Sequence, residues 1–115
     1  MSRPPKAGID YFPLDVDFFT DKKIRILKAR YGADGIAIYL YLLCEIYRAG
    51  YYIRFDDDML FILSNDLGMS PDKVKQVLKF LLERSLLDST LFQSDTILTS
   101  AGIQKRFQLA VKERA

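Results

Sequence analysis

Apolar residues recur at helical spacing along most of the chain, and glycines mark where the helices should stop. A helix over residues 20–32 begins at Thr20, a good capping residue, and ends at Gly32. A second helix, over residues 34–48, has apolar side chains at a 3.6-residue period and stops at Gly50. This pattern predicts a mainly helical protein.

The helix over residues 34–48 is apolar almost all round, which is typical of a helix at the centre of a fold or against a partner. A central core helix is the simpler interpretation, and the alternative is a face for homo-oligomer formation. The candidate interface residues, on this helix and just after it, are Ile38, Tyr41, Leu42, Tyr47, Tyr51 and Tyr52.

The middle of the chain has the pattern of a short strand over residues 51–55 followed by two helices, over 56–67 and 70–84. Gly68 lies in the turn between the two helices. Ser70 and Pro71 form a strong helix start, because serine caps and proline at the first position has no donor to lose. The residues predicted to form the buried face of the second of these helices are Val74, Val77, Leu78, Leu81 and Leu82.

The ends of the chain are predicted to be an arm and a helix. Residues 1–19 hold three of the four prolines and predict an extended arm, while 100–115 predicts a helix. This helix has no stop signal, so we expect the natural protein to continue beyond it. The arm residues predicted to fold back on the domain are Ile9, Tyr11, Phe12, Leu14 and Val16.

Residues 86–99 have the pattern of two short strands joined by a hairpin. A strand, two helices joined by a Gly-containing turn and a hairpin follow one another in the order of a winged helix-turn-helix. In that fold the second helix enters the DNA major groove, N-terminal residues foremost. The candidate DNA contacts on the helix over 70–84 are therefore Ser70, Lys73, Lys75, Gln76 and Lys79.

The tip of the predicted wing, Gln93, Ser94 and Asp95, has an acid and no base, so it should read DNA poorly. The helix over 20–32 is strongly basic, although the whole chain has a formal charge of only +2. Two interpretations of its cations are possible. They form a patch that binds DNA phosphates, or they only make up the solvent-exposed side of a helix whose other side is buried. Together with Arg30, the basic candidates there are Lys22, Lys23, Arg25 and Lys28.

Residue types that carry chemistry are scarce. The chain has no His and a single Cys, Cys44, so we expect no zinc site, no cofactor and no catalytic activity. Carboxylates gather at residues 15–21 and 56–58 without the pattern of a calcium loop. The longest apolar stretch, 36–44, is too short to cross a membrane, and we expect a cytoplasmic protein.

Five stretches resemble the amino-terminal domain of phage and prophage replisome-organiser proteins. They are DYFPLDVDFF at 10–19, KIR at 23–25, YGADG at 31–35, IYRAGYY at 46–52 and LTSAGIQKR at 98–106. The resemblance extends over about residues 5–108. Such domains are similar in layout to the amino-terminal winged helix of the primosome protein DnaD. In that protein the amino-terminal domain is associated with self-association and protein contacts, while the carboxy-terminal part binds DNA.

The resemblance implies a replication-initiation protein whose partners are DNA, other replication proteins and further copies of itself. Residues 1–115 would then form one winged-helix domain, with a core over 33–99, an arm and basic helix before it and the C-terminal helix after it. Two alternatives remain from the sequence: a pure assembly module that does not touch DNA, and a winged-helix transcriptional regulator.

Overall fold

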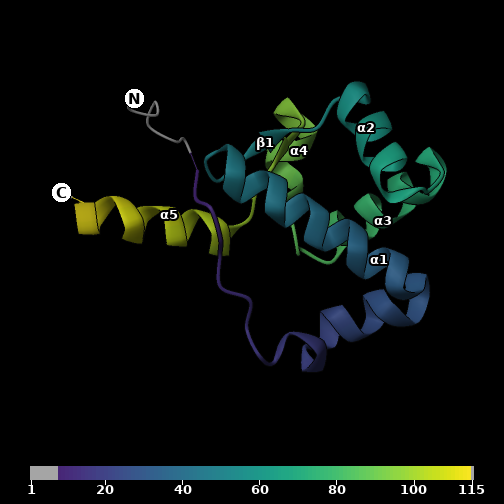
Figure 1. Ribbon diagram of the computed structural model, residues 1–115, viewed down its shortest axis with the longest axis horizontal. Helices are drawn as coiled ribbons and strands as arrows, with labels where there is room; N and C mark the ends of the chain where they lie inside the picture. Colours follow the sequence, from purple (N-terminus) through teal and green to yellow (C-terminus); the bar gives the residue numbers. More distant parts are fainter. Residues whose placement is uncertain (1–7, 115) are drawn as a thin grey trace.

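A computed structural model describes the backbone of residues 8–114 and the side chains of residues 8–109. This part of the chain is mainly helical and carries a small two-stranded sheet (Figure 1). The elements, in chain order, are a 3-10 turn (Phe18–Thr20), α1 (Lys22–Ala49), β1 (Ile53–Arg54), α2 (Asp57–Leu67), α3 (Pro71–Glu83), α4 (Ser89–Asp95), β2 (Ile97–Leu98) and α5 (Ala101–Arg114).

The two helices predicted before residue 50 are the two halves of α1. Gly32, at φ 66° and ψ −157°, breaks the helical backbone between them, and Gly50 ends the second half at φ 112°. The cap is Asp21, whose carboxylate accepts hydrogen bonds from the backbone N–H groups of Lys23 and Ile24. The prediction of two helices divided at Gly32 is confirmed, but the cap is one residue later than Thr20.

The second half of α1 lies at the centre of the fold, with α2 and α3 packed beside it (Figure 1). Its Ile38, Leu42 and Ile46 are fully buried. The helix is apolar almost all round because it is enclosed on several sides, as the simpler interpretation predicted. The predicted inward face of α3 is also confirmed: its fully or nearly fully buried members are Val74, Val77, Leu78 and Leu81, and Leu82 is half-buried.

Burial contradicts most of the predicted homo-oligomer face. Ile38, Leu42, Tyr47 and Tyr51 are enclosed by the chain itself, so they are not available to a partner. Tyr41 is half-buried. Of the six candidates only Tyr52, 55% exposed, presents a largely open side chain.

The hairpin predicted over residues 86–99 is wrong. Residues 89–95 form α4, whose first turn is capped by Asp88 accepting a hydrogen bond from the N–H of Leu91. The strand that follows, β2, pairs with β1 in antiparallel register, with Ile53 opposite Leu98. The predicted wing tip, Gln93 to Asp95, is therefore the last turn of a helix. A full wing is not formed by this segment.

The N-terminal arm runs beside α1, as predicted, but only some of its apolar residues fold back (Figure 1). The N–H of Ile9 donates to the Tyr47 carbonyl at 3.1 Å, and the Phe12 ring stacks on Tyr47 at 4.6 Å. The other three apolar residues of the arm are not buried against the domain, contrary to the prediction: exposed side chains occur at Tyr11, Leu14 and Val16. Residues 1–7 of the predicted arm lie outside the described residues.

Helix α5 begins at Ala101, as the pattern over residues 100–115 predicted, and extends away from the other helices (Figure 1). Ser100 caps it, accepting a hydrogen bond from the N–H of Ile103, and Ile103 is buried. Its extent agrees with the predicted helix up to residue 114, and residue 115 lies outside the described residues. Among the described residues no helix is both long and apolar enough to span a membrane.

Candidate nucleic-acid interface

The open face of α3 is electrically balanced. Lys75, Gln76 and Lys79 are exposed, as a DNA-reading helix requires, but Asp72 and Glu83 are exposed on the same helix. The Lys79 ammonium lies 3.9 Å from the Glu83 carboxylate, one helical turn away. Two lysines and two acids leave this helix face without a net positive charge, so it attracts phosphate weakly.

Two further α3 candidates are occupied within the protein. The Lys73 ammonium forms an ion pair with the Asp34 carboxylate, just after the kink of α1, and both side chains are partly exposed. The Ser70 hydroxyl accepts a hydrogen bond from the N–H of Lys73 at 3.2 Å and so caps the helix. The structure therefore assigns both residues a part in holding α3 in place.

The first half of α1 carries a denser and freer positive charge. Its apolar side, with Ile24 and Leu27 buried, points into the fold and turns the cations outward. Among the residues that the structure describes, none of these cations forms an ion pair. We call this surface the basic face; its residues, all exposed, are Lys22, Lys23, Arg25, Lys28 and Arg30.

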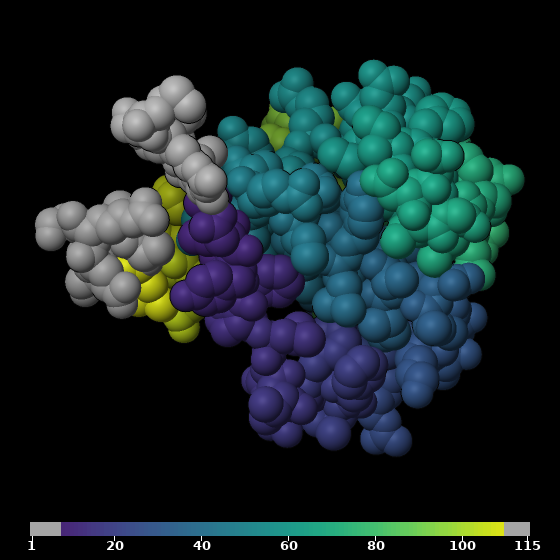
Figure 2. All heavy atoms as spheres, in the orientation of Figure 1, coloured from purple at the N-terminus to yellow at the C-terminus, as the bar shows by residue number. Residues whose placement is uncertain are grey.

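Helical spacing divides the basic face into two flanks. Lys23 and Arg30, seven residues apart, lie on one flank, while Arg25 and Lys28 lie on the other. Arg25 and Lys28 line a shallow hollow together with Phe19. Figure 2 shows this half of α1, with the 3-10 turn beside it, along the lower edge of the molecule.

Acidic side chains border the start of the basic face. Asp15, Asp17 and Asp21 line an open pocket together with Lys23. Two of the acids hold the backbone: Asp15 accepts a hydrogen bond from the N–H of Asp17 at 2.8 Å, and Asp21 caps α1. No cluster of metal-ligating side chains occurs in the described part of the chain. The basic face is consequently most positive toward its C-terminal end.

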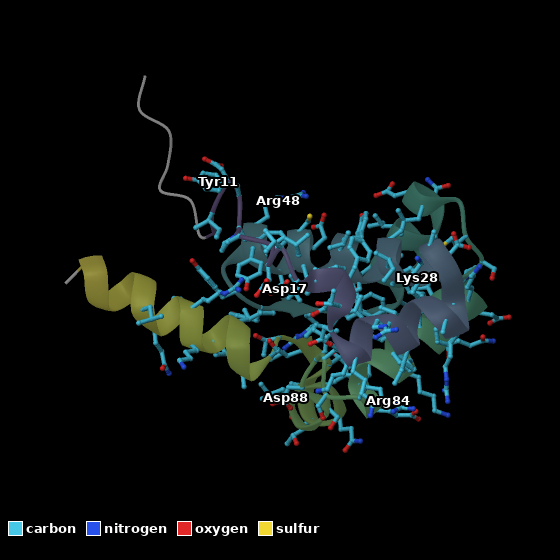
Figure 3. The ribbon with its side chains drawn as sticks, turned by 90° about the horizontal axis from the view of Figure 1, so that it is seen from below. Tyr11, Asp17, Lys28, Arg48, Arg84 and Asp88 are labelled. Carbon is cyan, nitrogen blue, oxygen red and sulfur yellow. The ribbon has the colours of Figure 1, made fainter. Side chains whose placement is uncertain are left out.

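Sequence reasoning missed one cation, Arg84, at the end of α3. The guanidinium carbons of Arg30 and Arg84 lie 5.6 Å and 5.4 Å from the centroid of the same ring, that of Phe80. Figure 3 shows Arg84 at the lower edge of the molecule, and Lys28 on the half of α1 that faces the viewer. Phe80 and Arg84 are four residues apart on one helix, a spacing visible in the sequence, whereas the approach of Arg30 to the same ring depends on how α1 and α3 pack.

A groove of about 590 Å³ separates α3 from α4. Apolar side chains of both helices, Leu78, Leu82 and Phe92, line it together with Lys75 and Lys79. The lysines predicted to read DNA therefore border an apolar hollow.

Two tyrosines on α1, Tyr39 and Tyr41, have side-chain pKa values above the ordinary value for tyrosine. The Tyr41 hydroxyl donates a 2.6 Å hydrogen bond to the Asp66 carboxylate of α2, which raises the pKa of Tyr41 to about 12. Burial is the main cause that raises the pKa of Tyr39, which stacks on Phe18. Tyr41 links α2 to α1, while Tyr39 packs against the 3-10 turn and lines the open pocket that Lys23 also borders.

Comparison with known proteins agrees with the phage-related part of the resemblance. The family described as Lin1244/Lin1753-like, N-terminal matches residues 11–103. A phage-related protein of Listeria innocua, described as uncharacterized and named Lin1244/Lin1753, is 33% identical over 114 residues. That match covers 99% of this chain and 37% of the Listeria protein, so the chain spans little more than a third of its relative's length. No solved structure matches the chain. The chain belongs to the Lin1244/Lin1753-like N-terminal family.

Proposed function

We propose that this domain is a non-catalytic DNA-binding module of a phage-type DNA replication initiation protein, and that it holds DNA through the basic face. The observation that carries the proposal is the set of five exposed cations within residues 22–30, none of them ion-paired among the described residues. Each cation that meets a phosphate releases condensed counterions, and this release supplies most of the free energy of non-specific DNA binding.

The proposed contact is to the phosphate backbone rather than to base edges. The face is mostly lysine, which acts as a point charge, and it lies on the outside of a helix whose inner side is packed on the core. The α3 face, which base reading would need, is balanced in charge. Binding should thus depend strongly on salt and weakly on sequence.

The fold supports this proposal through its order of elements. We infer a modified winged helix-turn-helix, in which α2, the turn at Gly68 and α3 form the helix pair and β1 pairs with β2, the strand after α4. The N–H of Asp88 also donates to the Thr99 carbonyl, beside β2, where a further strand of a wing would begin. Helix α4 then replaces the wing tip.

The replication role is supported by the resemblance of five stretches of the chain to replisome-organiser domains and by the phage-related name of the Listeria relative. Such a role would place the protein in the bacterial cytoplasm, with other replication-initiation proteins as partners. An unrelated transcriptional regulator is less well supported, because it would need a base-reading helix.

The proposal is tested by fluorescence anisotropy of a labelled duplex of about 20 base pairs titrated with the chain. At about 50 mM salt we expect saturable binding that weakens steeply as salt rises. An unrelated duplex should bind within a few-fold of the first. Absence of binding at about 50 mM salt would rule out the proposal for this domain.

A second candidate function, protein assembly, is favoured by one observation. Phe61 and Ile62 on α2 are 60% and 53% exposed, although both are large and apolar. Adjacent exposed apolar side chains of this size are a common mark of protein contact. Light scattering at rising concentration tests self-association: a mass above one chain that Phe61→Ser and Ile62→Ser together abolish supports it, and a monomer throughout removes it.

A further inference from the structure

We propose that Arg30 and Arg84 form a two-guanidinium clamp for DNA phosphates, built on the ring of Phe80. The inference rests on the proposed function and extends the DNA-contacting surface from the basic face of α1 to the C-terminal end of α3. It names a specific site where the proposed function gives only a charged surface.

The ring of Phe80 sets an upper limit on the separation of the two arginines. Their guanidinium carbons lie 5.6 Å and 5.4 Å from its centroid, so they are at most about 11 Å apart, the sum of the two distances. A guanidinium over an aromatic ring is held by the ring's quadrupole. Both side chains are exposed, which leaves N–H donors of each available to a ligand.

The platform itself is rigid. Phe80 is 2% exposed, and the Tyr31 ring packs edge-on against it at 5.7 Å. The chain turns sharply just after Arg84, where Ser85 adopts φ 59° and the N–H of Leu86 donates to the Leu81 carbonyl at 2.9 Å. The ring and the backbone beside Arg84 are therefore held in place before any ligand arrives, which lowers the entropy lost on binding.

The charge of the site is not neutralised by the protein. Among the described residues neither arginine forms an ion pair, and the neighbouring Glu83 lies beside Lys79. Two like charges held near one ring repel each other, and a bound anion relieves that repulsion. Arginine also grips phosphate with two parallel hydrogen bonds, which lysine cannot do.

The position of the clamp favours a phosphodiester chain over a single anion. Arg30 shares the flank of α1 that carries Lys23, so the clamp continues the basic face. Two cations at most about 11 Å apart are close enough to meet adjacent phosphates of one strand, which rises ~3.4 Å per nucleotide along the helix axis. The two guanidiniums can thus hold neighbouring phosphates of one DNA strand.

Lysine substitution tests the clamp because it keeps the charge and removes the planar fork. We expect Arg30→Lys and Arg84→Lys each to weaken duplex binding about fivefold, and the double variant to lose less than the product of the two. The control is Arg48→Lys with Arg54→Lys, two exposed arginines outside the basic face, which should bind like the wild type. Thermal unfolding checks that each variant is folded. Unchanged affinity in both single variants would overturn the clamp.

A second measurement separates the failure of the clamp from the failure of the proposed function. The side-chain Nε–H resonances of Arg30 and Arg84 are followed by NMR while inorganic pyrophosphate is added to the wild-type chain. If the clamp binds the anion, the Nε–H resonances of Arg30 and Arg84 should shift together, and those of Arg48 and Arg54 should not shift. If the duplex does not bind but these two resonances move, the proposed function fails and the anion clamp stands. If the duplex binds and the two resonances stay, the clamp alone is overturned.

Discussion

Lys73 of α3 and Asp34 of α1 form an ion pair that ties the helix predicted to read DNA to the helix packed behind it. A cation in that position is shared with a carboxylate before any phosphate approaches. This ion pair explains why Lys73, which the sequence pattern places on the open side of the helix, is a poor candidate for a DNA contact. It also fixes the start of α3 against the kink of α1.

The first prediction concerns this pair. Lys73→Met and Asp34→Asn should each lower the free energy of unfolding by about 0.5 kcal/mol, because a partly exposed ion pair contributes little. The double variant should lose no more than either single one, as measured by urea denaturation. Duplex affinity of Lys73→Met should fall less than that of Lys28→Gln. A larger fall for Lys73→Met would return α3 to the DNA interface.

Gly32 provides a test of the kink. Its φ of 66° and ψ of −157° lie in a backbone region that glycine adopts without strain and other residues rarely adopt. A Cβ at this position would nevertheless meet no atom within 4 Å. Gly32→Ala should therefore destabilise the fold by about 1–3 kcal/mol through the backbone alone.

The matched control for the kink is Gly102→Ala in α5. Its Cβ would meet nothing closer than the Ser100 hydroxyl at 3.9 Å, and the position is helical. This change should stabilise the protein by about 0.5–1 kcal/mol. Equal denaturation midpoints for the two variants would show that α1 does not break at Gly32.

Thr99 joins three elements through one buried hydroxyl. It donates to the Tyr51 carbonyl at 2.9 Å and accepts from the Gln104 side chain at 2.9 Å, so it links the end of α1, β2 and the start of α5. Thr99→Val should cost about 1–3 kcal/mol, because the buried partners lose hydrogen bonds. Thr90→Val on exposed α4 should change stability by less than about 0.5 kcal/mol. Matching losses in the two would contradict this network.

Tyr41 provides a prediction for alkaline pH. Its pKa, raised to about 12 by the hydrogen bond to Asp66, means that the folded protein holds this proton more tightly than the unfolded chain does, where the pKa is 10.0. The stabilisation is present below pH 10 and is lost as pH rises toward 12. Ultraviolet titration should show a late component that Tyr41→Phe removes and Asp66→Asn moves to lower pH. A late component unaffected by Asp66→Asn would rule out this cause.

Much of the helical fold could be predicted from local signals. Gly32, Gly50 and Gly68 end helices where the sequence indicated, and the Ser70–Pro71 start of α3 is where it was expected. These residues act through their own backbone, so their effect is visible without knowing the tertiary structure.

The predictions that failed depend on contacts between distant residues. A short apolar run such as residues 86–87 is compatible with a strand or a helix. The strand pairing that the structure shows joins β2 to β1, which lies far earlier in the sequence, and not to residues 86–87. The cap Asp88 before residues 89–95 was the one local signal for α4. Likewise, Lys73 looked free because its partner, Asp34, lies on α1, and the approach of Arg30 to the ring that Arg84 contacts was not visible in the sequence.

The central claim is that the basic face of α1, rather than α3, meets the DNA backbone. The most direct test compares the salt dependence of duplex binding for two variants that each remove two positive charges, Arg25→Gln with Lys28→Gln and Lys75→Gln with Lys79→Gln. We expect the first pair to weaken binding and to lower the magnitude of the log–log salt slope by about 1.8, at about 0.9 for each lost phosphate contact. The second pair should leave the slope close to that of the wild type. A larger loss of slope for the α3 pair would contradict the account.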